Sequence, residues 1–487
     1  MSLLLASRRL VARARGGRRM LSAHALAVDN PYSGETYCEV ALTSEADARA
    51  TISRAAAAQK AWERTALAER IALCERFMAA MEAMRGEVAA DISGMMGKPY
   101  EHAWGEMGGL FERTRGMMAL APAALAEEAL PARGGCERAI TREPVGVVLA
   151  ICPWNFPLLT AVNTVVPAVL AGNAVVIKHA ERTPLCGEHF ARAFAAAGAP
   201  EGLVAAVQTP HDATARLIAS EKDVGFVAFT GSVAGGRAVY SAVASARFID
   251  CTLELGGKDP AYVAEDADAA AAAAGLVDGA CFNAGQSCCG IERVYVHRSK
   301  YDAFLEAARA ECDAYVLGDP ADAATTQGPM AQPGAAPFLG AQVRDALAKG
   351  ARLLSGAADD AQRDAAGKGR FFAPALLADC THGMDVMRDE SFGPIVAVAP
   401  VDGDDEAVAL MRDSEYGLTA AVFTQDAARV RDIGRRVGAG TVFMNRCDYL
   451  DPELPWTAGG EHTGKGVSLS KHGFGGVTKL KGYNMRV

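Results

Sequence analysis

Two adjacent cysteines, Cys288 and Cys289, lie in the polar segment NAGQSCCG at residues 283–290. The segment joins a helix-like run to a strand-like run. A thiolate is the reactive form of cysteine, and a free cysteine has a pKa of ~8.5. A polar, glycine-containing loop exposes a sulfur atom rather than burying it. One of the two cysteines is therefore a candidate nucleophile and the other a packing residue, with a core cysteine as the alternative interpretation.

Two further segments carry side chains that suit the support of a nucleophile. In PWNFP at residues 153–157, two prolines restrict the backbone on either side of Asn155. A rigidly held amide can donate an N–H to a developing oxyanion, although an Asx-turn explains the segment equally well. In LELGGK at residues 253–258, Glu254 stands between two leucines at a strand end. Burial raises the pKa of such a carboxyl and suits general-base work, unless a neighbouring base pairs with it.

Two segments have the composition of a nucleotide-binding site. A strand-like run ends at Lys178, and Glu181 follows it. In a doubly wound fold an adenosine ribose lies there, and a carboxylate accepts from its hydroxyls and repels a 2′-phosphate. In FTGSVAGG, Gly231 and Ser232 free the backbone N–H groups of a helix start for a pyrophosphate. A surface Lys–Glu pair and a simple capped helix start are the alternatives.

A sixth segment, ESFGP at residues 390–394, places Glu390 and Phe392 ahead of a Gly-Pro turn. A carboxylate and an aromatic ring in this position suit contacts with a ribose and with a flat ring. An ordinary loop is the alternative. Each of the six segments is a modest signal when it is taken alone.

The order of strand-like and helix-like segments indicates how these side chains are positioned. Residues 44–128 have helical periodicity, and residues 136–151 have the texture of strands. Apolar strand-like segments then alternate with alanine-rich helix-like segments, which predicts a parallel, doubly wound sheet. The strand-like segments are 174–178, 204–207, 224–230 and 247–255, and the helix-like segments are 184–197, 212–220 and 235–244. Such sheets bind ligands at the carboxyl ends of their strands, where Lys178 and Glu254 fall.

The alternation restarts after Gly256 and predicts a second α/β domain. Its first segments are helix-like, strand-like and again helix-like, at residues 266–283, 291–297 and 300–317. The last stretch, 441–487, is rich in glycine and ends in a strand-like tail at 482–487. No window of 18 apolar residues occurs, so we expect no transmembrane helix and no membrane partner.

Charge is unevenly distributed along the 487 residues, whose formal net charge is −9. This balance argues against nucleic acid as a partner, because phosphate binding needs a basic face. Residues 1–28 contain six arginines and no acid, which is typical of an organellar transit peptide, with a disordered basic tail as the alternative. We expect removal of the transit peptide near residue 22 and a location in the mitochondrial matrix, with plastid or cytoplasm as alternatives. The twelve cysteines show no paired CxxC spacing, so no metal site is expected.

Six motifs occur in the order PWNFP, KxxE, FTGSxxxG, LELGGK, GQxC and ESFGP. In this order they resemble the NAD-dependent, non-acylating aldehyde dehydrogenases over residues 25–487. The resemblance implies an α/β fold with a Rossmann-type NAD-binding domain, an α/β catalytic domain and a small β oligomerisation arm, in a homodimer or homotetramer. The implied ranges are 1–22 for the transit peptide, 23–127 and 144–255 for the NAD-binding domain, 256–469 for the catalytic domain, and 128–143 with 470–487 for the arm.

The resemblance also implies roles for single residues. Cys288 is the nucleophile, Asn155 and the backbone N–H of Cys288 bind the oxyanion, and Glu254 is the general base. The implied cofactor contacts are Trp154, Lys178, Glu181, Gly231, Ser232, Leu255, Glu390 and Phe392. The implied activity is oxidation of an aldehyde to the carboxylic acid through a thiohemiacetal and a thioester on the cysteine, with NAD favoured over NADP.

The chain departs from better-known members at two positions that are sometimes assigned to a proton path. Thr164 stands where many members have a lysine, and Ser468 stands where many have a glutamate. These departures put the proton path in doubt, and a water chain is one replacement. They leave the three proposed catalytic residues in place.

The substrate is the least defined part of the prediction. The loop at residues 445–456 carries three acids, a tyrosine and Trp456, which suits a cationic aldehyde. Arg446 weakens that interpretation, and solvated loop charges explain the acids as well. Phe156, Leu159 and Trp456 equally suit an apolar tunnel for aliphatic or aromatic aldehydes.

Two other functions compete with hydrolytic aldehyde oxidation. An acylating relative would pass the acyl group to coenzyme A, but that chemistry does not need the water-activating base that Glu254 offers. A non-catalytic NAD-binding protein on the same fold is the second alternative. The presence of Cys288, Asn155 and Glu254 together argues against it.

Overall fold

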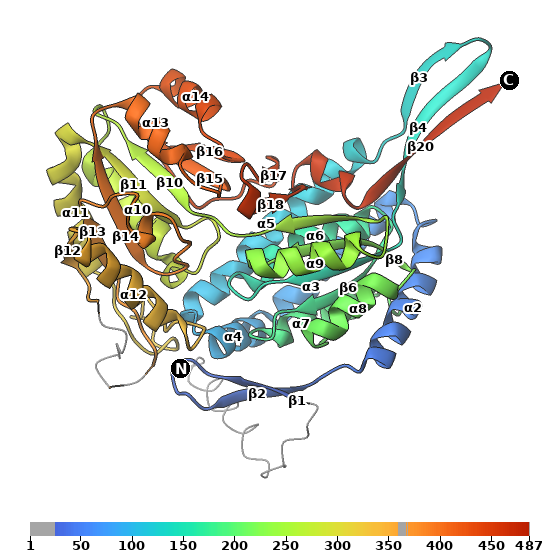
Figure 1. Cartoon of the computed structure of the whole chain (residues 1–487). Coiled ribbons are helices and arrows are strands. Elements are labelled where there is room, and N and C mark those ends of the chain that lie inside the picture. The colour runs from blue at the N-terminus through green and yellow to red at the C-terminus, as the bar shows by residue number, and fades with distance from the viewer. Residues whose placement is uncertain (1–24, 359–366, 368, 487) are drawn as a thin grey trace.

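The structure is a computed structural model that describes residues 25–358, 367 and 369–486. The predicted transit peptide at 1–22 lies outside these described residues. Two α/β bodies lie side by side, and a β arm projects from one of them and carries the C-terminal end of the chain (Figure 1). Among the described residues, no helix is long and apolar enough to cross a membrane.

A hairpin and four helices open the chain, as the helical periodicity of residues 44–128 predicts. The elements are β1 (Ala25–Asp29), β2 (Thr36–Ala41), α2 (Glu45–Trp62), α3 (Leu67–Ala83), α4 (Arg85–Met96) and α5 (Tyr100–Ala124). Ser44 begins α2, because its side chain accepts a hydrogen bond from the backbone N–H of Asp47. Helix α5 packs against α6 (Pro157–Leu170), and this contact brings α5 to the site.

The first large sheet has the strand order β18-β9-β8-β5-β6-β7. Its strands are β5 (Val147–Cys152), β6 (Ala174–His179), β7 (Val204–Val207), β8 (Val224–Thr230), β9 (Asp250–Glu254) and the short β18 (Gly464–Lys465). The helices between them are α6, α7 (Pro184–Ala196), α8 (His211–Ser220) and α9 (Val233–Ala244). Strand β5 pairs in parallel with both β6 and β8, so the strand order switches there. A ligand site is expected at the carboxyl ends of β5 and β8.

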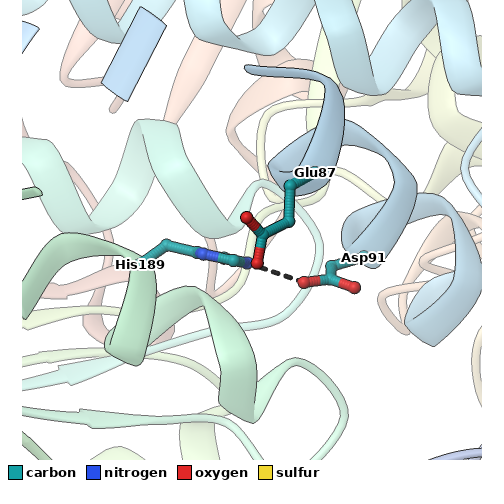
Figure 2. A group of neighbouring side chains, drawn as sticks. All are labelled: Glu87, Asp91 and His189. Carbon is teal, nitrogen blue, oxygen red and sulfur yellow. Dashed lines mark hydrogen bonds and ion pairs between the residues drawn. The ribbon is translucent and has the colours of Figure 1, made fainter. Parts of the chain in front are cut away.

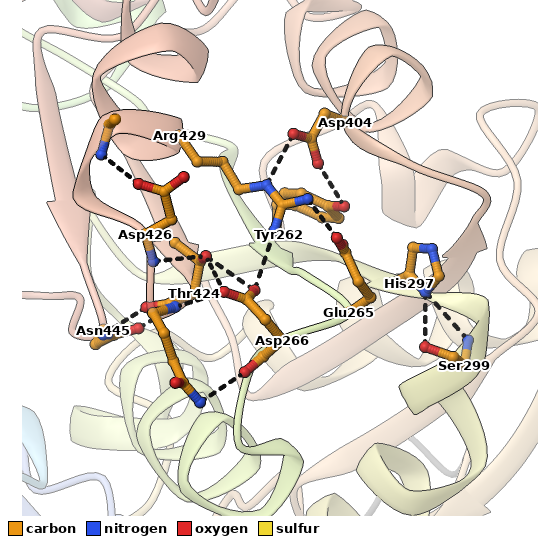
Figure 3. Close-up of polar contacts among 12 residues, drawn as sticks. Tyr262, Glu265, Asp266, His297, Ser299, Asp404, Thr424, Asp426, Arg429 and Asn445 are labelled. Atoms are coloured by element: carbon orange, nitrogen blue, oxygen red, sulfur yellow. Dashed lines mark hydrogen bonds and ion pairs between the residues drawn. The ribbon is translucent and has the colours of Figure 1, made fainter.

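The second large sheet has the strand order β12-β13-β14-β11-β10-β15-β16 and is parallel apart from the β12–β13 pair. Its strands are β10 (Asp259–Val263), β11 (Ile291–His297), β12 (Arg352–Ser355), β13 (Ala375–Ala378), β14 (Ile395–Val401), β15 (Thr419–Phe423) and β16 (Thr441–Met444). The accompanying helices are α10 (Ala269–Cys281), α11 (Tyr301–Asp313), α12 (Ala335–Ala348), α13 (Asp404–Arg412) and α14 (Ala427–Arg436). Figure 3 shows how Arg429 on α14 binds the carboxylates of Glu265, Asp266 and Asp404, which joins three segments of this body.

A three-stranded antiparallel sheet forms the projecting arm. It consists of β3 (Glu128–Arg133), β4 (Cys136–Pro144) and β20 (Thr478–Arg486), with β4 between the other two. Leu480, Tyr483 and Met485 are exposed on β20. Before the arm, β17 (Trp456–Thr457) pairs with β19 (Val467–Ser468), and β18 pairs with β9 of the first sheet. The chain therefore returns from the second body to the edge of the first before it enters the arm.

The predicted elements agree with the structure best where apolar runs are uninterrupted. Strands predicted at 204–207, 224–230 and 291–297 have those bounds in the structure. Other ends were misplaced. The helix predicted at 266–283 begins later, because the Asp268 side chain caps it by accepting from the N–H groups of Ala270 and Ala271. The strand predicted to begin at 247 begins at Asp250, and the tail strand begins earlier than 482, at Thr478.

Candidate active site

The loop that carries Cys288 follows α10 and makes a sharp turn. Asn283 and Ala284 have φ angles of 55° and 57°, a left-handed conformation that is uncommon for residues with a side chain. Gly285 continues the turn, and a Cβ atom there would lie 2.2 Å from the carbonyl carbon of Gly393. The turn therefore packs directly against the predicted ESFGP loop. Of residues 283–290, only Cys288 is not buried.

Cys289 differs from its neighbour in burial and in its hydrogen bond to Asp448. It is buried, and its Sγ donates to the Oδ1 atom of Asp448 at 2.9 Å. The hydrogen bond with Cys288, burial and the Asp448 carboxylate all raise the pKa of the Cys289 thiol. Because the thiolate is the nucleophilic form, Cys289 is held in its unreactive state. This geometry supports the prediction that Cys288, rather than Cys289, is the nucleophile.

Asn155 lies in the loop between β5 and α6, at the switch in strand order. It is buried, with 4% of its surface exposed. Its backbone carbonyl oxygen accepts from Asn283 Nδ2 at 3.0 Å and from Lys98 Nζ at 2.9 Å. The Asn155 loop and the cysteine loop are thus in direct contact. The structure brings together two segments that the sequence analysis could only place separately.

Glu254 ends β9 and is joined to the C-terminal part of the chain. Its Oε1 atom accepts from Ser468 Oγ at 2.5 Å, and its Oε2 atom accepts from Thr230 Oγ1 at 3.4 Å. Burial raises the pKa of the Glu254 carboxyl, although these bonds and the charge of Arg113 act in the opposite direction. A carboxyl with a raised pKa is suited to accept a proton. Ser468, which the sequence analysis linked to the proton path, is therefore in direct contact with the predicted base.

Arg113 on α5 is a charged residue of the site that the sequence analysis missed. It is buried, and its Nη1 atom donates to the carbonyl oxygen of Leu159 and to Asn163 Oδ1. Burial lowers its pKa, while the charges of Cys289 and Glu254 have the opposite effect. No motif marked Arg113, because only the packing of α5 on α6 brings it near these groups.

The predicted adenosine contacts lie at the carboxyl end of β6. Lys178 is buried, and burial lowers its pKa. Glu181 lies in the exposed turn that follows, where its Oε1 atom is 3.4 Å from His211 Nε2. The pyrophosphate prediction needs one correction. The N–H of Gly231 is not free, because it donates to the carbonyl oxygen of Glu254 at 2.9 Å. Ser232 caps α9 by accepting from the N–H of Gly235.

The predicted nicotinamide side is built around Glu390. Its Oε1 atom accepts from the N–H of Gly257 at 2.9 Å, and burial, followed by the charge of Glu292, raises its pKa to about 7. A Cβ atom at Gly256 would lie 2.8 Å from the Glu390 carboxylate, so a side chain there would displace that carboxylate. Phe392 packs its ring edge-to-face with Trp154 at 5.6 Å between centroids. The carboxylates, aromatic rings and glycines present are those that suit the two riboses and the flat ring of a nicotinamide dinucleotide.

The predicted substrate residues lie on two segments, the start of α6 and strand β17. Phe156 stacks on Phe282, and Leu159 packs against Gly109 of α5. Trp456 is buried in β17, where it pairs with Ser468. In the loop at 445–456, the Arg446 guanidinium already covers the ring of Tyr449 at 3.9 Å. This contact weakens the interpretation that the tyrosine receives a cationic aldehyde.

Two buried Lys–Glu pairs border the site, and sequence reasoning found neither. Lys98 Nζ lies 2.6 Å from Glu106 Oε2, and Lys258 Nζ lies 2.5 Å from Glu292 Oε2. At most 4% of any of the four side chains is exposed. The glutamate of each pair also accepts from two consecutive backbone N–H groups of a site loop. No local sequence signal marks such pairs, since their partners meet only in the folded protein.

A third polar cluster lies away from these loops. Figure 2 shows Glu87, Asp91 and His189, whose ligand-type atoms lie within 4.8 Å of one another. His189 Nε2 bonds to Asp91 at 2.8 Å, and Arg192 binds Glu87 at 2.8 Å. An arginine beside the carboxylate supplies the positive charge that a metal would supply. We interpret this cluster as an ion-pair network.

Comparison with known proteins identifies the chain. The first sheet, with its switch at β5, defines an α/β protein of the nucleotide-binding type. A sequence model of the aldehyde dehydrogenase family matches residues 20–482. The chain therefore belongs to the aldehyde dehydrogenase family, which makes it an oxidoreductase that acts on aldehydes. This confirms the resemblance inferred from the six motifs and the fold class that it implied.

Several relatives match nearly the whole chain. The chain is 34% identical to 3,6-anhydro-alpha-L-galactose dehydrogenase of Streptomyces coelicolor, over 94% of this chain and 90% of that protein. It is 33% identical to the mitochondrial aldehyde dehydrogenase of Homo sapiens, over 94% of this chain and 88% of that protein. Among solved structures, an NAD-dependent aldehyde dehydrogenase from Sinorhizobium meliloti matches with a TM-score of 0.90 and 32% identity, over 95% of this chain and 91% of that chain.

Proposed function

We propose that this enzyme oxidises an aldehyde to the carboxylic acid through a covalent intermediate on Cys288. The observation that carries this proposal is the contrast within the cysteine pair: Cys288 is accessible, whereas Cys289 is buried and hydrogen bonded to Asp448. The Cys288 thiolate attacks the carbonyl carbon, and the aldehyde oxygen becomes the oxyanion of a thiohemiacetal. Asn155 Nδ2 and the backbone N–H of Cys288 donate to that oxyanion.

Collapse of the thiohemiacetal releases a hydride and leaves a thioester on Cys288. A nicotinamide cofactor, when bound, supplies the chemistry that accepts this hydride. Glu254 then removes a proton from water, which attacks the thioester and frees the acid and the thiolate. The Ser468 hydroxyl orients the Glu254 carboxylate, and the raised pKa of that carboxyl makes it a stronger base than a solvated glutamate.

Two observations favour hydrolysis over acyl transfer to coenzyme A. Glu254 is present, and two hydroxyl groups hold it in place. Acyl transfer to a thiol needs no activated water, so an acylating enzyme has no use for this arrangement. Coenzyme A is therefore expected to leave the rate and the product of the reaction unchanged.

We propose NAD as the cofactor, with NADP disfavoured. Glu181 lies at the carboxyl end of β6, where its carboxylate accepts from ribose hydroxyls and repels a 2′-phosphate. Similar proteins include members with either preference, such as a succinate-semialdehyde dehydrogenase of Deinococcus radiodurans named for NADP at 35% identity. The preference of this chain therefore depends on its own residues, of which Glu181 is the clearest.

We also propose a mitochondrial matrix location and assembly into a homodimer or homotetramer. The acid-free, arginine-rich residues 1–28 support the location. The exposed apolar side chains on β20 support assembly through the arm, because the edge strands of a projecting sheet readily pair or pack with another copy. Fusion of residues 1–28 to a reporter tests the location, and light scattering of the purified protein tests the assembly.

The proposed reaction is tested with a panel of aldehydes, NAD+ or NADP+, and coenzyme A present or absent. Cys288→Ala and Cys289→Ala form a matched pair of variants for the nucleophile. We expect NADH formation from the unmutated enzyme, none from Cys288→Ala, and at least a third of the normal rate from Cys289→Ala. Full activity of Cys288→Ala would move the nucleophile elsewhere.

A further inference from the structure

Lys98 and Glu106 are the only ion pair among the described residues that bonds to the backbone of Asn155. The Lys98 ammonium contacts Glu106 Oε2 at 2.6 Å and the carbonyl oxygen of Asn155 at 2.9 Å. It also lies 4.2 Å from the ring centroid of Phe156, the next residue. Carboxylate, carbonyl and aromatic face together occupy the ammonium. The Lys98 ammonium is therefore fully engaged within the protein and needs no bound substrate as a partner.

Glu106 holds the same loop from its other end. Its Oε1 atom accepts from the N–H of Leu158 at 2.8 Å and from the N–H of Leu159 at 3.3 Å. These N–H groups belong to the first turn of α6, which has no hydrogen bond from its own N-cap side chain. Since unpaired N–H groups at a helix start favour a negative charge, Glu106 acts as the cap from the neighbouring helix α5. The pair therefore fixes residues 155–159 at both ends.

Burying this pair is not explained by stability alone. Moving a lysine and a glutamate out of water costs several kcal/mol per ion, and apolar replacements of similar volume are often as stable. The contacts of the pair do fix the position of the Asn155 loop. This matters for catalysis, because an oxyanion donor must be held within a fraction of an ångström of its working position. Asn283 Nδ2 is the second donor to the Asn155 carbonyl, at 3.0 Å, and comes from the cysteine loop itself.

We propose that Lys98 and Glu106 are positioning residues that aim the Asn155 amide at the oxyanion formed on Cys288. The inference rests on the proposed roles of Asn155 and Cys288. The pair touches neither substrate nor cofactor. It acts through the backbone of residues 155–159, with Asn283 as its counterpart on the cysteine loop.

The test uses Lys98→Met/Glu106→Gln, which keeps the shape of both side chains and leaves no unpaired buried charge. The matched control is Lys258→Met/Glu292→Gln, an equally buried pair that bonds to the backbone at Ser391 and Phe392 instead. Each double variant is made in the unmutated enzyme and in Asn155→Ala. Two quantities are measured: the rate of NADH formation in the first turnover, and the dissociation constant of NAD+ from quenching of tryptophan fluorescence.

We expect the Lys98/Glu106 variant to slow the first turnover at least tenfold, with the NAD+ dissociation constant unchanged within twofold. In the Asn155→Ala background, the same double substitution should slow the first turnover less than twofold, because the amide that the pair positions is absent. The control pair should weaken NAD+ binding and should show no dependence on Asn155. An equal slowing in both backgrounds, or none in the unmutated enzyme, would overturn the inference while the proposed function stands.

A second variant protects the test if the Lys98/Glu106 variant fails to fold. Asn283→Gly removes the other donor to the Asn155 carbonyl and suits the φ of 55° at this position. The same Asn155-dependent slowing, by a smaller factor, is expected; a slowing that does not depend on Asn155 counts against the inference. Absence of NADH from the unmutated enzyme would overturn the proposed function and, with it, the inference.

Discussion

The two buried Lys–Glu pairs have the same chemistry but hold opposite sides of the site. Lys98–Glu106 bonds to the loop of Asn155, on the side where the aldehyde reacts. Lys258–Glu292 bonds to the backbone N–H groups of Ser391 and Phe392, beside Glu390 on the cofactor side. Each glutamate accepts from two consecutive N–H groups, so each loop is fixed in orientation as well as position. The comparison teaches that these two buried ion pairs each hold one loop of the site.

The largest effect should follow when one charge of a pair is left alone. Lys98→Met or Lys258→Met leaves a buried carboxylate without its partner, which typically costs ~3–5 kcal/mol of stability. Each double variant, which removes both charges, should unfold at a higher temperature than its own single variant. The thermal unfolding midpoints of all four variants check this order. If a double variant is no more stable than its single variant, the lysine does not stabilise the charge of its glutamate partner.

Substitutions on the aldehyde side should mainly lower kcat, and substitutions on the cofactor side should mainly raise the KM for NAD+. Asn155→Ala removes one oxyanion donor, a change that costs about 10²–10³ in kcat in comparable enzymes. Its KM for NAD+ should stay within twofold of the normal value. Glu390→Gln should instead raise the KM for NAD+ with a smaller effect on kcat. Steady-state kinetics with one aldehyde measure both, and a loss of NAD+ affinity in Asn155→Ala would break the comparison.

The cofactor side should also depend on pH through Glu390. Its pKa is raised from 4.5 to about 7 in the folded protein, so the folded state holds this proton more tightly than the unfolded state. The favourable contribution is complete below pH 4.5 and is lost as pH rises through 7. A shift of this size corresponds to about 3 kcal/mol. Glu390→Gln should therefore gain stability relative to the unmutated enzyme at pH 8 but not at pH 4, as judged by urea unfolding at the two pH values.

Asp448, which accepts from the Cys289 thiol, should also make the stability depend on pH, but over a lower pH range. Burial raises its pKa from 3.8 to about 6, so its stabilising contribution is lost as pH rises from 3.8 through 6. Asp448→Asn should therefore gain stability relative to the unmutated enzyme above pH 6 but not below pH 3.8, as judged by urea unfolding. An unchanged pH profile in Asp448→Asn would place the ionised carboxylate in water rather than against Cys289.

The smallest expected effect concerns the choice of cofactor. Glu181→Gln removes the charge that repels a 2′-phosphate, and the ratio of kcat/KM for NAD+ to that for NADP+ should fall about tenfold, or ~1.4 kcal/mol. The proposal that Glu181 sets the preference fails if the ratio stays constant. His211, which faces Glu181, offers a control: His211→Gln should change the ratio less.

The sequence predicted the reactive groups better than the groups that hold them. Cys288, Asn155 and Glu254 lie in short motifs whose residue types suit their chemistry, and the structure brings the loops of Asn155 and Cys288 into contact. Lys98 lies 57 residues from Asn155, and no spacing in the sequence connects the two. Lys98 precedes α5 and Asn155 precedes α6, so the two meet only in the folded protein and local patterns carried no signal for their contact.

The fold also divides into elements that local sequence predicts and elements that only tertiary contacts create. Runs such as residues 291–297 predicted their strands correctly, because a parallel strand that is buried on both faces needs a largely hydrophobic sequence. The two-residue strand β18 could not be predicted, since it forms only where Gly464 and Lys465 meet the edge of β9. A Cβ atom at Gly464 would lie 2.0 Å from the carbonyl oxygen of Leu253, and the backbone there has a φ of 108°, so both the tertiary contact and the local conformation select glycine.

The central claim is that Cys288 forms the thioester and that Glu254 is needed to hydrolyse it. The most direct measurement is peptide mass spectrometry of Glu254→Gln after mixing with an aldehyde and NAD+. The account predicts one burst equivalent of NADH per active site and an acyl group on Cys288, with Cys289 unmodified. An acyl group on Cys289, or continued turnover with no acyl-enzyme, would contradict it.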